Sequence, residues 1–215
     1  MNFARIKSAG VELEGGWNTL PPAGYVGDPS VHVRASHVGE AHVRAYTFAG
    51  LAKQVTENYP HATDSSCGMH THISVHNASD YAAMMEPGFS PFCIEHLTAW
   101  ATIKGVKNVN FWDRIRGRNT YCGNRYAKPP EKQFFMVGKG DHRYSHWCFC
   151  FKNHGTAEFR TLPTFRSAKL AVEALEQVYI AVETWLAMAP EVVEVIATLE
   201  VPAPAYFPRK AFACV

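Results

Sequence analysis

The 215-residue sequence predicts a single α+β domain, with an antiparallel sheet and helices packed on one of its faces. Three short segments alternate polar and apolar residues with the period of two that is typical of a half-buried strand. Three longer segments repeat apolar residues at the spacing of an amphipathic helix. The chain length suits one domain with a sizeable core. The strand-like segments are 10–14, 69–75 and 156–162, and the helix-like segments are 46–59, 90–105 and 166–188.

The first strand-like segment carries two acids at alternate positions. Glu12 and Glu14 share one face of the strand, whereas Val11 and Leu13 share the other. Because the apolar pair faces a core, the two carboxylates face a cleft or solvent. These residues alone favour solvated acids, since most acids in proteins are exposed. Gly15-Gly16 predicts a turn that ends the strand.

A loop, a hairpin and a helix are predicted next. Residues 15–30 are rich in glycine and proline, which indicates a loop. Residues 31–44 alternate roughly and predict two short strands with a turn near residues 36–39. Residues 46–59 have a helical pattern, and Tyr59-Pro60 ends it because the residue before a proline disfavours the helical conformation.

Two histidines lie at alternate positions in the stretch 67–75, which we place at the centre of the chain. Because successive side chains of a strand point to opposite faces, His70 and His72 lie on the same face. Two imidazoles side by side on a strand are either metal ligands or polar groups that are costly to bury. We therefore ask which other residues could complete a site around them.

The second half of the chain is predicted to be mainly helical around one hairpin. Residues 79–106 have a helical pattern on both sides of a Pro87-Gly88 break. Residues 147–162 predict a β-hairpin, and residues 166–188 predict a long amphipathic helix. We expect residues 191–215 to form a C-terminal tail, of which residues 201–215 are extended and packed on the surface.

Composition indicates an ordinary globular protein. Hydrophobic residues make up 47% of the chain and charged residues 19%, and the net charge of +2 does not call for nucleic acid. Residues 108–146 are locally basic, with eight lysines and arginines against three acids. No apolar run is long enough for a membrane span, and residues 1–7 lack the apolar segment of a signal peptide. Six cysteines without a CxxC pair favour free thiols. Together, these features lead us to expect a cytoplasmic enzyme that does not contact a membrane.

A third polar pair extends the pattern of alternate charged residues. Glu158 and Arg160 share one face of their strand, as do the glutamate pair and the histidine pair of the earlier strands. Three such pairs predict a sheet with one face on a core and the other lining a charged site. Carboxylates with imidazole suit Mg²⁺ or Mn²⁺, and the arginines of the basic segment suit polyphosphate. A divalent cation and arginines around a phosphoryl group are the usual components of phosphoryl transfer.

The three motifs together resemble those of a known family. Residues 67–74 (CGMHTHIS) resemble the GMHxHxS segment of glutamine synthetases, residues 154–160 (HGTAEFR) resemble the ExR strand that follows it, and residues 10–14 (GVELE) resemble the opening ExE strand. In order and spacing they are similar to the amidoligase family, the carboxylate–amine ligases related to glutamine synthetase and glutamate–cysteine ligase. The resemblance covers residues 8–190. It implies one catalytic domain over residues 1–215, with a curved antiparallel sheet of the glutamine-synthetase type and helices on its outer face.

The resemblance also implies an activity. In such ligases ATP phosphorylates a carboxylate, an amine attacks the acyl phosphate, and an amide bond forms, with Mg²⁺ or Mn²⁺ bound in the site. The expected substrates are a small-molecule or peptide carboxylate and an amine. A macromolecular acceptor and an oligomeric assembly are both compatible with this expectation.

The ligand positions follow by matching the motifs. By resemblance, Glu12, His70 and Glu158 bind the cation that holds the terminal phosphates of the nucleotide. Glu14 and Glu40 bind a second cation beside the acyl acceptor.

Further positions receive catalytic and binding roles. Arg160 resembles the arginine that binds the transferring phosphate, and Asp28, in Asp28-Pro29-Ser30, resembles a residue that orients the amine. Arg118 and Arg125 are candidates for phosphate or carboxylate binding because of their charge and position. His72 is expected to support the site or contact the substrate or nucleotide. The expected catalytic residues are Arg160, Asp28 and Glu40.

Other interpretations remain open. Cys148 and Cys150 share a strand face and, with Cys67 and the two histidines, could form a zinc site, although the glutamates would then have no role. A metal-dependent hydrolase, or a factor that modifies nucleic acid or another phosphate compound, would use the basic segment and act without ATP. A catalytically inactive relative would bind nucleotide without turnover, and the retained acids argue against it.

Overall fold

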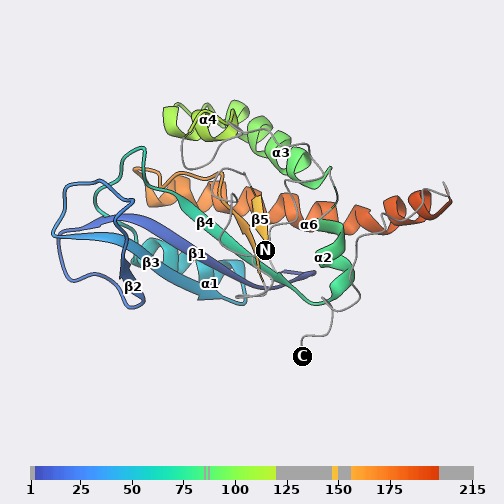
Figure 1. The fold of residues 1–215 in the computed structure, drawn as a ribbon, viewed down its shortest axis with the longest axis horizontal. Coiled ribbons are helices and arrows are strands. Elements are labelled where there is room, and N and C mark those ends of the chain that lie inside the picture. The colour runs from blue at the N-terminus through green and yellow to red at the C-terminus, as the bar shows by residue number, and fades with distance from the viewer. Residues whose placement is uncertain (1–2, 85, 87, 120–146, 150–155, 199–215) are drawn as a thin grey trace.

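The computed structural model contains a six-stranded antiparallel sheet with five helices among the described residues, which confirms the predicted α+β class (Figure 1). It describes the chain except residues 1–2, 85, 87, 120–146, 150–155 and 199–215, and only the backbone of 147–149 and 189–198. The strands lie in the order β2-β3-β1-β4-β6-β5. They are β1 (Ile6–Trp17), β2 (Tyr25–Gly27), β3 (His37–Ala45), β4 (Met69–Val75), β5 (Trp147–Phe149) and β6 (Ala157–Phe159). The helices are α1 (Phe48–Glu57), α2 (Ala78–Met84), α3 (Phe89–Lys104), α4 (Val109–Ile115) and α6 (Ala168–Thr198).

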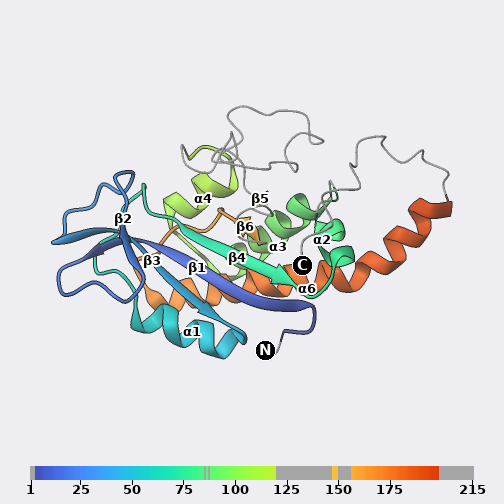
Figure 2. The ribbon, with the colours of Figure 1, turned by 60° about the horizontal axis from the view of Figure 1, so that its bottom comes forward.

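One face of the sheet is covered by helices, and the other carries polar side chains. Helix α1 packs against β1 and β3, and α6 packs against α1 on the same side of the sheet, as Figure 2 shows from a second direction. Helix α3, which was also predicted to cover the sheet, packs mainly against α6. Among the described residues, no helix has the length and apolar character needed to cross a membrane.

The core forms because the apolar residues of the strands alternate with the polar ones. Val11 and Leu13 of β1 and Ile73 of β4 are almost completely buried on the helix-covered face. Burying each such side chain stabilises the fold by roughly 1.5–3 kcal/mol. From the helices, Phe48 of α1 packs edge-on against Tyr179 of α6, with ring centroids 6.0 Å apart.

Strand β1 is longer than predicted, because the chain does not turn at Gly15-Gly16. The strand continues to Trp17, and both glycines are needed where other segments approach its backbone closely. A Cβ atom on Gly15 would lie 2.5 Å from the Cβ of Pro60, and one on Gly16 would lie 2.5 Å from the Cβ of Ala35. These glycines therefore mark close packing against the strand and not a turn.

The hairpin predicted within residues 31–44 is also wrong. Strand β3 begins at His37, and its partner on the outer edge is β2, which lies within the predicted loop 15–30. The alternation in residues 31–36 has another cause. Val31 is buried whereas His32 is exposed, so this loop alternates in burial without pairing to a strand.

The remaining elements agree with the prediction except at three places. Helix α1 begins after Thr47, whose hydroxyl accepts a hydrogen bond from the Gly50 amide. Strands β5 and β6 pair as predicted. Helix α4 lies in a segment that was predicted to be irregular. Strand β6 is shorter than the predicted residues 156–162, and α6 continues to Thr198, past the predicted start of the tail at residue 191.

Candidate functional site

The strand register brings the polar side chains of four strands together on the face of the sheet opposite α1. Strand β1 is paired with β3 on one side and with β4 on the other, and β4 is paired with β6. Residues directly opposite each other on neighbouring antiparallel strands have Cβ atoms about 4.5–5.5 Å apart. The sequence predicted which residues share a face, and the register adds which of them are neighbours. The opposite pairs are Glu14–Glu40, Glu12–His70 and His72–Glu158.

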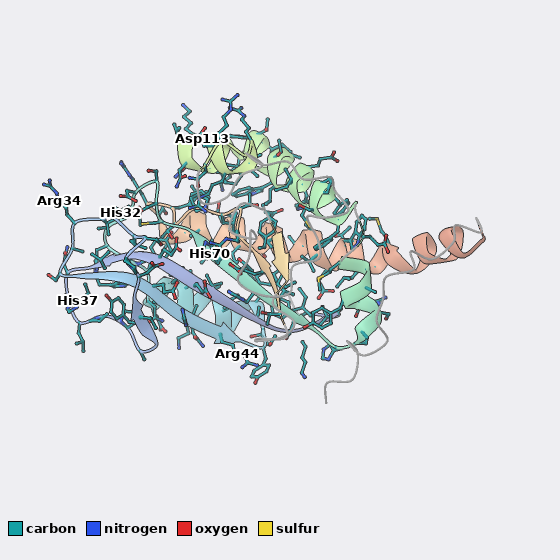
Figure 3. The ribbon with its side chains drawn as sticks, in the orientation of Figure 1. His32, Arg34, His37, Arg44, His70 and Asp113 are labelled. Atoms are coloured by element: carbon teal, nitrogen blue, oxygen red, sulfur yellow. The ribbon has the colours of Figure 1, made fainter. Side chains whose placement is uncertain are left out.

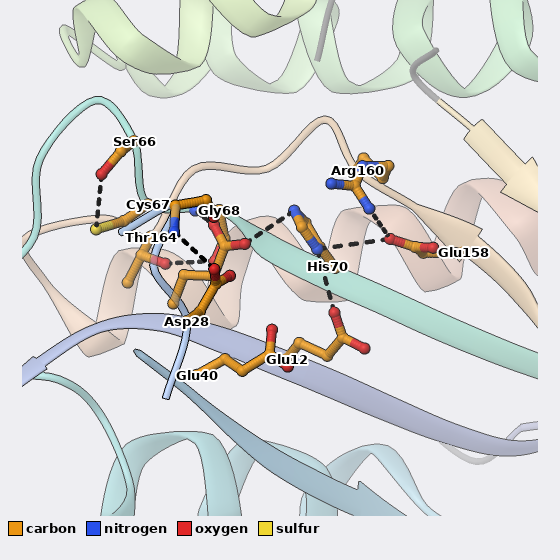
Figure 4. Close-up of polar contacts among 12 residues, drawn as sticks. Glu12, Asp28, Glu40, Ser66, Cys67, Gly68, His70, Glu158, Arg160 and Thr164 are labelled. Atoms are coloured by element: carbon orange, nitrogen blue, oxygen red, sulfur yellow. Dashed lines mark hydrogen bonds and ion pairs between the residues drawn. The ribbon is translucent and has the colours of Figure 1, made fainter. Parts of the chain in front are cut away.

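His70 lies at the centre of this site (Figure 4). Its Nδ1 atom is 3.2 Å from Oε2 of Glu12 and 3.5 Å from Oε1 of Glu158. Its Nε2 atom is 3.7 Å from Oε1 of Glu14. The side chain is nearly inaccessible to solvent, with 2% of the residue exposed. One buried imidazole therefore contacts glutamates from both predicted ligand sets.

Glu12, His72 and Glu158 form the first group of side chains that could hold a metal ion. One potential ligand atom from each lies within 4.8 Å of the others. The Nε2 atom of His72 is 2.9 Å from Oε1 of Glu12, and its Nδ1 atom is 3.2 Å from the hydroxyl of Thr156. A second partner that orients the ring is typical of histidines that bind metals. The resemblance places His70 in this group, whereas the geometry favours His72 there and His70 between the two groups.

Glu14, Asp28 and Glu40 form the second group, again with potential ligand atoms within 4.8 Å of one another. The Glu14 carboxylate accepts a hydrogen bond from the amide of Gly68, and Asp28 accepts one from the amide of Ser30 at 2.7 Å. Glu14 and Glu40 were predicted to act together. Asp28 joins them because β2 pairs with β3 at Gly27–Gly39 and β2 ends immediately before Asp28. Three carboxylates without nitrogen or sulfur suit a hard cation such as Mg²⁺ or Mn²⁺.

Burial and neighbouring side chains shift the pKa values of Glu40 and Glu12. Burial raises the pKa of Glu40, and the negative charge of Glu12 raises it further, although a hydrogen bond with His42 acts in the opposite direction. For Glu12, burial also raises the pKa, but hydrogen bonds with His70 and His72 outweigh it and leave the pKa far below its ordinary value. The site therefore holds crowded negative charge that a divalent cation would neutralise.

Arg160 and Arg114 form the other side of the site. The Nη1 atom of Arg160 donates a hydrogen bond to Glu158. Burial raises the pKa of Glu158, but the Arg160 charge outweighs this effect, so the net pKa lies below its ordinary value. Arg114 of α4 is fully buried, and its Nη1 atom donates to the carbonyl oxygen of Arg160 at 3.1 Å. It therefore fixes the backbone that positions Arg160.

Sequence reasoning missed two supporting residues. Arg114 was counted only among the basic residues of the segment 108–146, although it lies three residues after Phe111 and next to Ile115, both of which are buried. Gly68 approaches the site so closely that a Cβ atom there would lie 2.6 Å from Nε2 of His70 and 3.0 Å from Oε2 of Glu14. The burial of Arg114 could have been inferred from its position on an apolar helix face.

The other candidate residues are less central or lie outside the described residues. Arg118 is exposed after the end of α4. Arg125, most of the basic segment and the side chains of Cys148 and Cys150 lie outside the described residues. Neither group of potential ligands in the described part of the chain includes a cysteine. Burial raises the pKa of the Cys67 thiol to about 11, which disfavours the thiolate that zinc binds.

Comparison of the chain with protein-family models, with curated proteins and with solved structures finds no match.

Proposed function

We propose that the protein is an ATP-dependent carboxylate–amine ligase that forms an amide bond through an acyl phosphate. The observation that carries the proposal is the pair of ligand groups on one sheet face, joined by the buried His70 and flanked by Arg160. The order of the three sequence motifs supports the same activity. The proposal includes the finer fold expectation, a curved sheet of the glutamine-synthetase type with its helices on the outer face.

Each group of side chains would hold one cation. Glu12, His72 and Glu158 would hold the cation that binds the terminal phosphates of ATP, and His70 would either complete this group or orient its glutamates. The three carboxylates of the second group would hold a cation beside the substrate carboxylate. Bound Mg²⁺ or Mn²⁺ would neutralise the charge of the phosphates and of the carboxylate that attacks them.

The side chains around the cations have distinct roles in this proposal. Arg160 donates to the transferring phosphoryl group, because a guanidinium is well suited to phosphate oxygens. Arg114 positions Arg160 through the backbone carbonyl that it binds. The resemblance gives Asp28 the role of orienting the amine, whereas its place in the second ligand group supports a role as a cation ligand. Both roles place it at the acyl-acceptor side of the site.

The direct test is the release of ADP in the presence of mixed acids and mixed amines. When the protein is mixed with MgATP and with pools of small-molecule and peptide carboxylates and amines, ADP should be released. The substitution Glu158→Ala should abolish this release because it removes a cation ligand. Glu173→Ala is a matched control, since Glu173 forms a surface ion pair with Lys104. If no pool supports ATP turnover and the protein does not bind nucleotide, the ligase proposal is wrong.

A metal-dependent phosphoryl hydrolase is the second candidate. Two adjoining groups of carboxylate and imidazole ligands also suit hydrolysis assisted by two metal ions. Release of phosphate from a phosphate ester with Mn²⁺ alone, without ATP or amine, would favour this candidate over the ligase. Nucleotide binding without any turnover would instead indicate an inactive relative.

A further inference from the structure

Gly68 contacts Glu14 of the second ligand group through both of its backbone polar groups. The amide of Gly68 donates to the Glu14 carboxylate, and the carbonyl oxygen of Gly68 accepts a hydrogen bond from the Glu14 amide at 3.0 Å. The position of the Glu14 carboxylate therefore depends on how the backbone at Gly68 is oriented. Groups that hold a metal-binding carboxylate in this way affect the affinity for the metal without touching it.

Glycine is required at this position, but glycine cannot fix its own backbone. A Cβ atom would lie 3.0 Å from Oε2 of Glu14 and 2.6 Å from Nε2 of His70, whose place in the whole molecule Figure 3 shows. Glycine has the widest range of backbone conformations, so it loses the most conformational freedom when it is ordered. Contacts from another segment must therefore set the directions of the two peptide groups that flank Gly68.

Thr164 supplies these contacts from the segment that follows β6 (Figure 4). Its amide donates to the carbonyl oxygen of Cys67 at 3.2 Å, and its hydroxyl donates to the carbonyl oxygen of Gly68 at 2.7 Å. The first contact holds the peptide group whose N–H donates to Glu14, and the second contact holds the next peptide group. Thr164 is 3% exposed, so solvent does not compete for these contacts.

Backbone contacts keep the segment around Thr164 in place. The amide of Met69 donates to the carbonyl oxygen of Leu162 at 2.9 Å, and Gly68 forms an antiparallel bridge with Pro163. Because these contacts do not use the Thr164 side chain, a substitution there can remove the hydroxyl contact and leave the segment paired with the start of β4.

From these contacts we propose that Thr164 is a positioning residue of the second ligand group. Its hydroxyl holds the backbone at Gly68 so that the Gly68 amide points at the Glu14 carboxylate, which is thereby kept beside the other two acids of the group. The proposal rests on the cation binding that is part of the proposed function. It adds a residue that neither the three sequence motifs nor the two ligand groups include.

The test is isothermal titration of the full-length protein with Mn²⁺ in two backgrounds that each keep one ligand group. Glu158→Gln keeps the second group, and Asp28→Asn keeps the first. Adding Thr164→Val to Glu158→Gln should weaken Mn²⁺ binding about three- to tenfold, because valine keeps the shape of threonine but lacks the hydroxyl donor. Adding it to Asp28→Asn should leave the Mn²⁺ affinity unchanged.

Further variants in the Glu158→Gln background separate positioning from a general loss of stability. Thr164→Ser keeps the hydroxyl and should restore the Mn²⁺ affinity, whereas Thr164→Ala lacks the hydroxyl and should weaken binding as Thr164→Val does. Thr98→Val is the matched control, since the Thr98 hydroxyl also donates to a backbone carbonyl oxygen at 2.7 Å, but within α3. It should leave the Mn²⁺ affinity unchanged. Thermal unfolding of the metal-free proteins shows that each variant is folded.

The possible outcomes separate this proposal from the proposed function. Unchanged Mn²⁺ affinity on adding Thr164→Val and Thr164→Ala to Glu158→Gln, or equal weakening at both ligand groups, would overturn the role of Thr164 and leave the cation sites in place. Absence of Mn²⁺ binding by the parent protein would overturn the cation sites themselves, and this proposal with them.

Discussion

The substitution Glu158→Gln is expected to remove one of two cation sites without unfolding the protein. Glutamine keeps the shape of the side chain and a carbonyl oxygen that can accept the hydrogen bond from Arg160. It removes the charge from the first ligand group, which then retains one carboxylate and one imidazole. Glu158 is 4% exposed, so solvent does not compensate for the lost ligand.

The size of the effect follows from binding linkage. A cation at a concentration 100 times its dissociation constant stabilises the folded state by about 2.7 kcal/mol per site. If the substitution weakens cation binding at the first site about 100-fold, the same cation concentration stabilises the folded state through that site by only about 0.4 kcal/mol. Since 1 kcal/mol shifts the midpoint of thermal unfolding by about 2–4 °C in a chain of this length, the Mn²⁺-dependent shift should shrink by about 5–9 °C.

Two measurements test this expectation. Isothermal titration with Mn²⁺ should give two sites in the parent protein and one in Glu158→Gln, and thermal unfolding with and without Mn²⁺ should show the smaller shift. Glu173→Gln, in a surface ion pair with Lys104, should behave as the parent protein does. If Glu158→Gln still bound two Mn²⁺ ions with unchanged affinity, the assignment of Glu158 as a ligand would be wrong.

Three further predictions follow from single contacts. Asp28→Asn should lower the Mn²⁺ affinity of the second group and leave the first group intact, so titration should again find one strong site. Gly68→Ala should weaken Mn²⁺ binding at least about tenfold, because the new methyl group would displace His70, whereas Gly27→Ala, with no atom within 4 Å of its added Cβ, should not. Cys67 should resist alkylation at pH 8 in the native protein, since a pKa of about 11 leaves only about one thousandth of the thiol ionised.

Each of these predictions has an outcome that contradicts it. Unchanged Mn²⁺ stoichiometry in Asp28→Asn would remove Asp28 from the ligand set. Equal Mn²⁺ affinity in Gly68→Ala and Gly27→Ala would show that the site tolerates a methyl group beside His70. Peptide mapping by mass spectrometry separates Cys67 from the other cysteines, and alkylation of Cys67 at the rate seen in denaturant would contradict its burial.

The site-facing residues could be predicted from the sequence because side-chain direction in a strand is a local property. Glu12 and Glu14, the histidine pair and Glu158 lie on the predicted face, since residues two apart in a strand always share one. Local periodicity likewise predicted helices α1, α3 and α6, although not the packing of α3 against α6. The prediction failed at Gly15-Gly16, where distant segments and not a turn require the absence of a side chain.

The tertiary structure alone decided how these residues are grouped. Strand register and loop closure depend on contacts between distant segments, so no local pattern shows that His72 lies opposite Glu158 or that Asp28 reaches Glu40. The burial of Arg114 has the same origin. The sequence by itself therefore determined which side chains face the site, whereas packing of the whole chain determined which of them are neighbours.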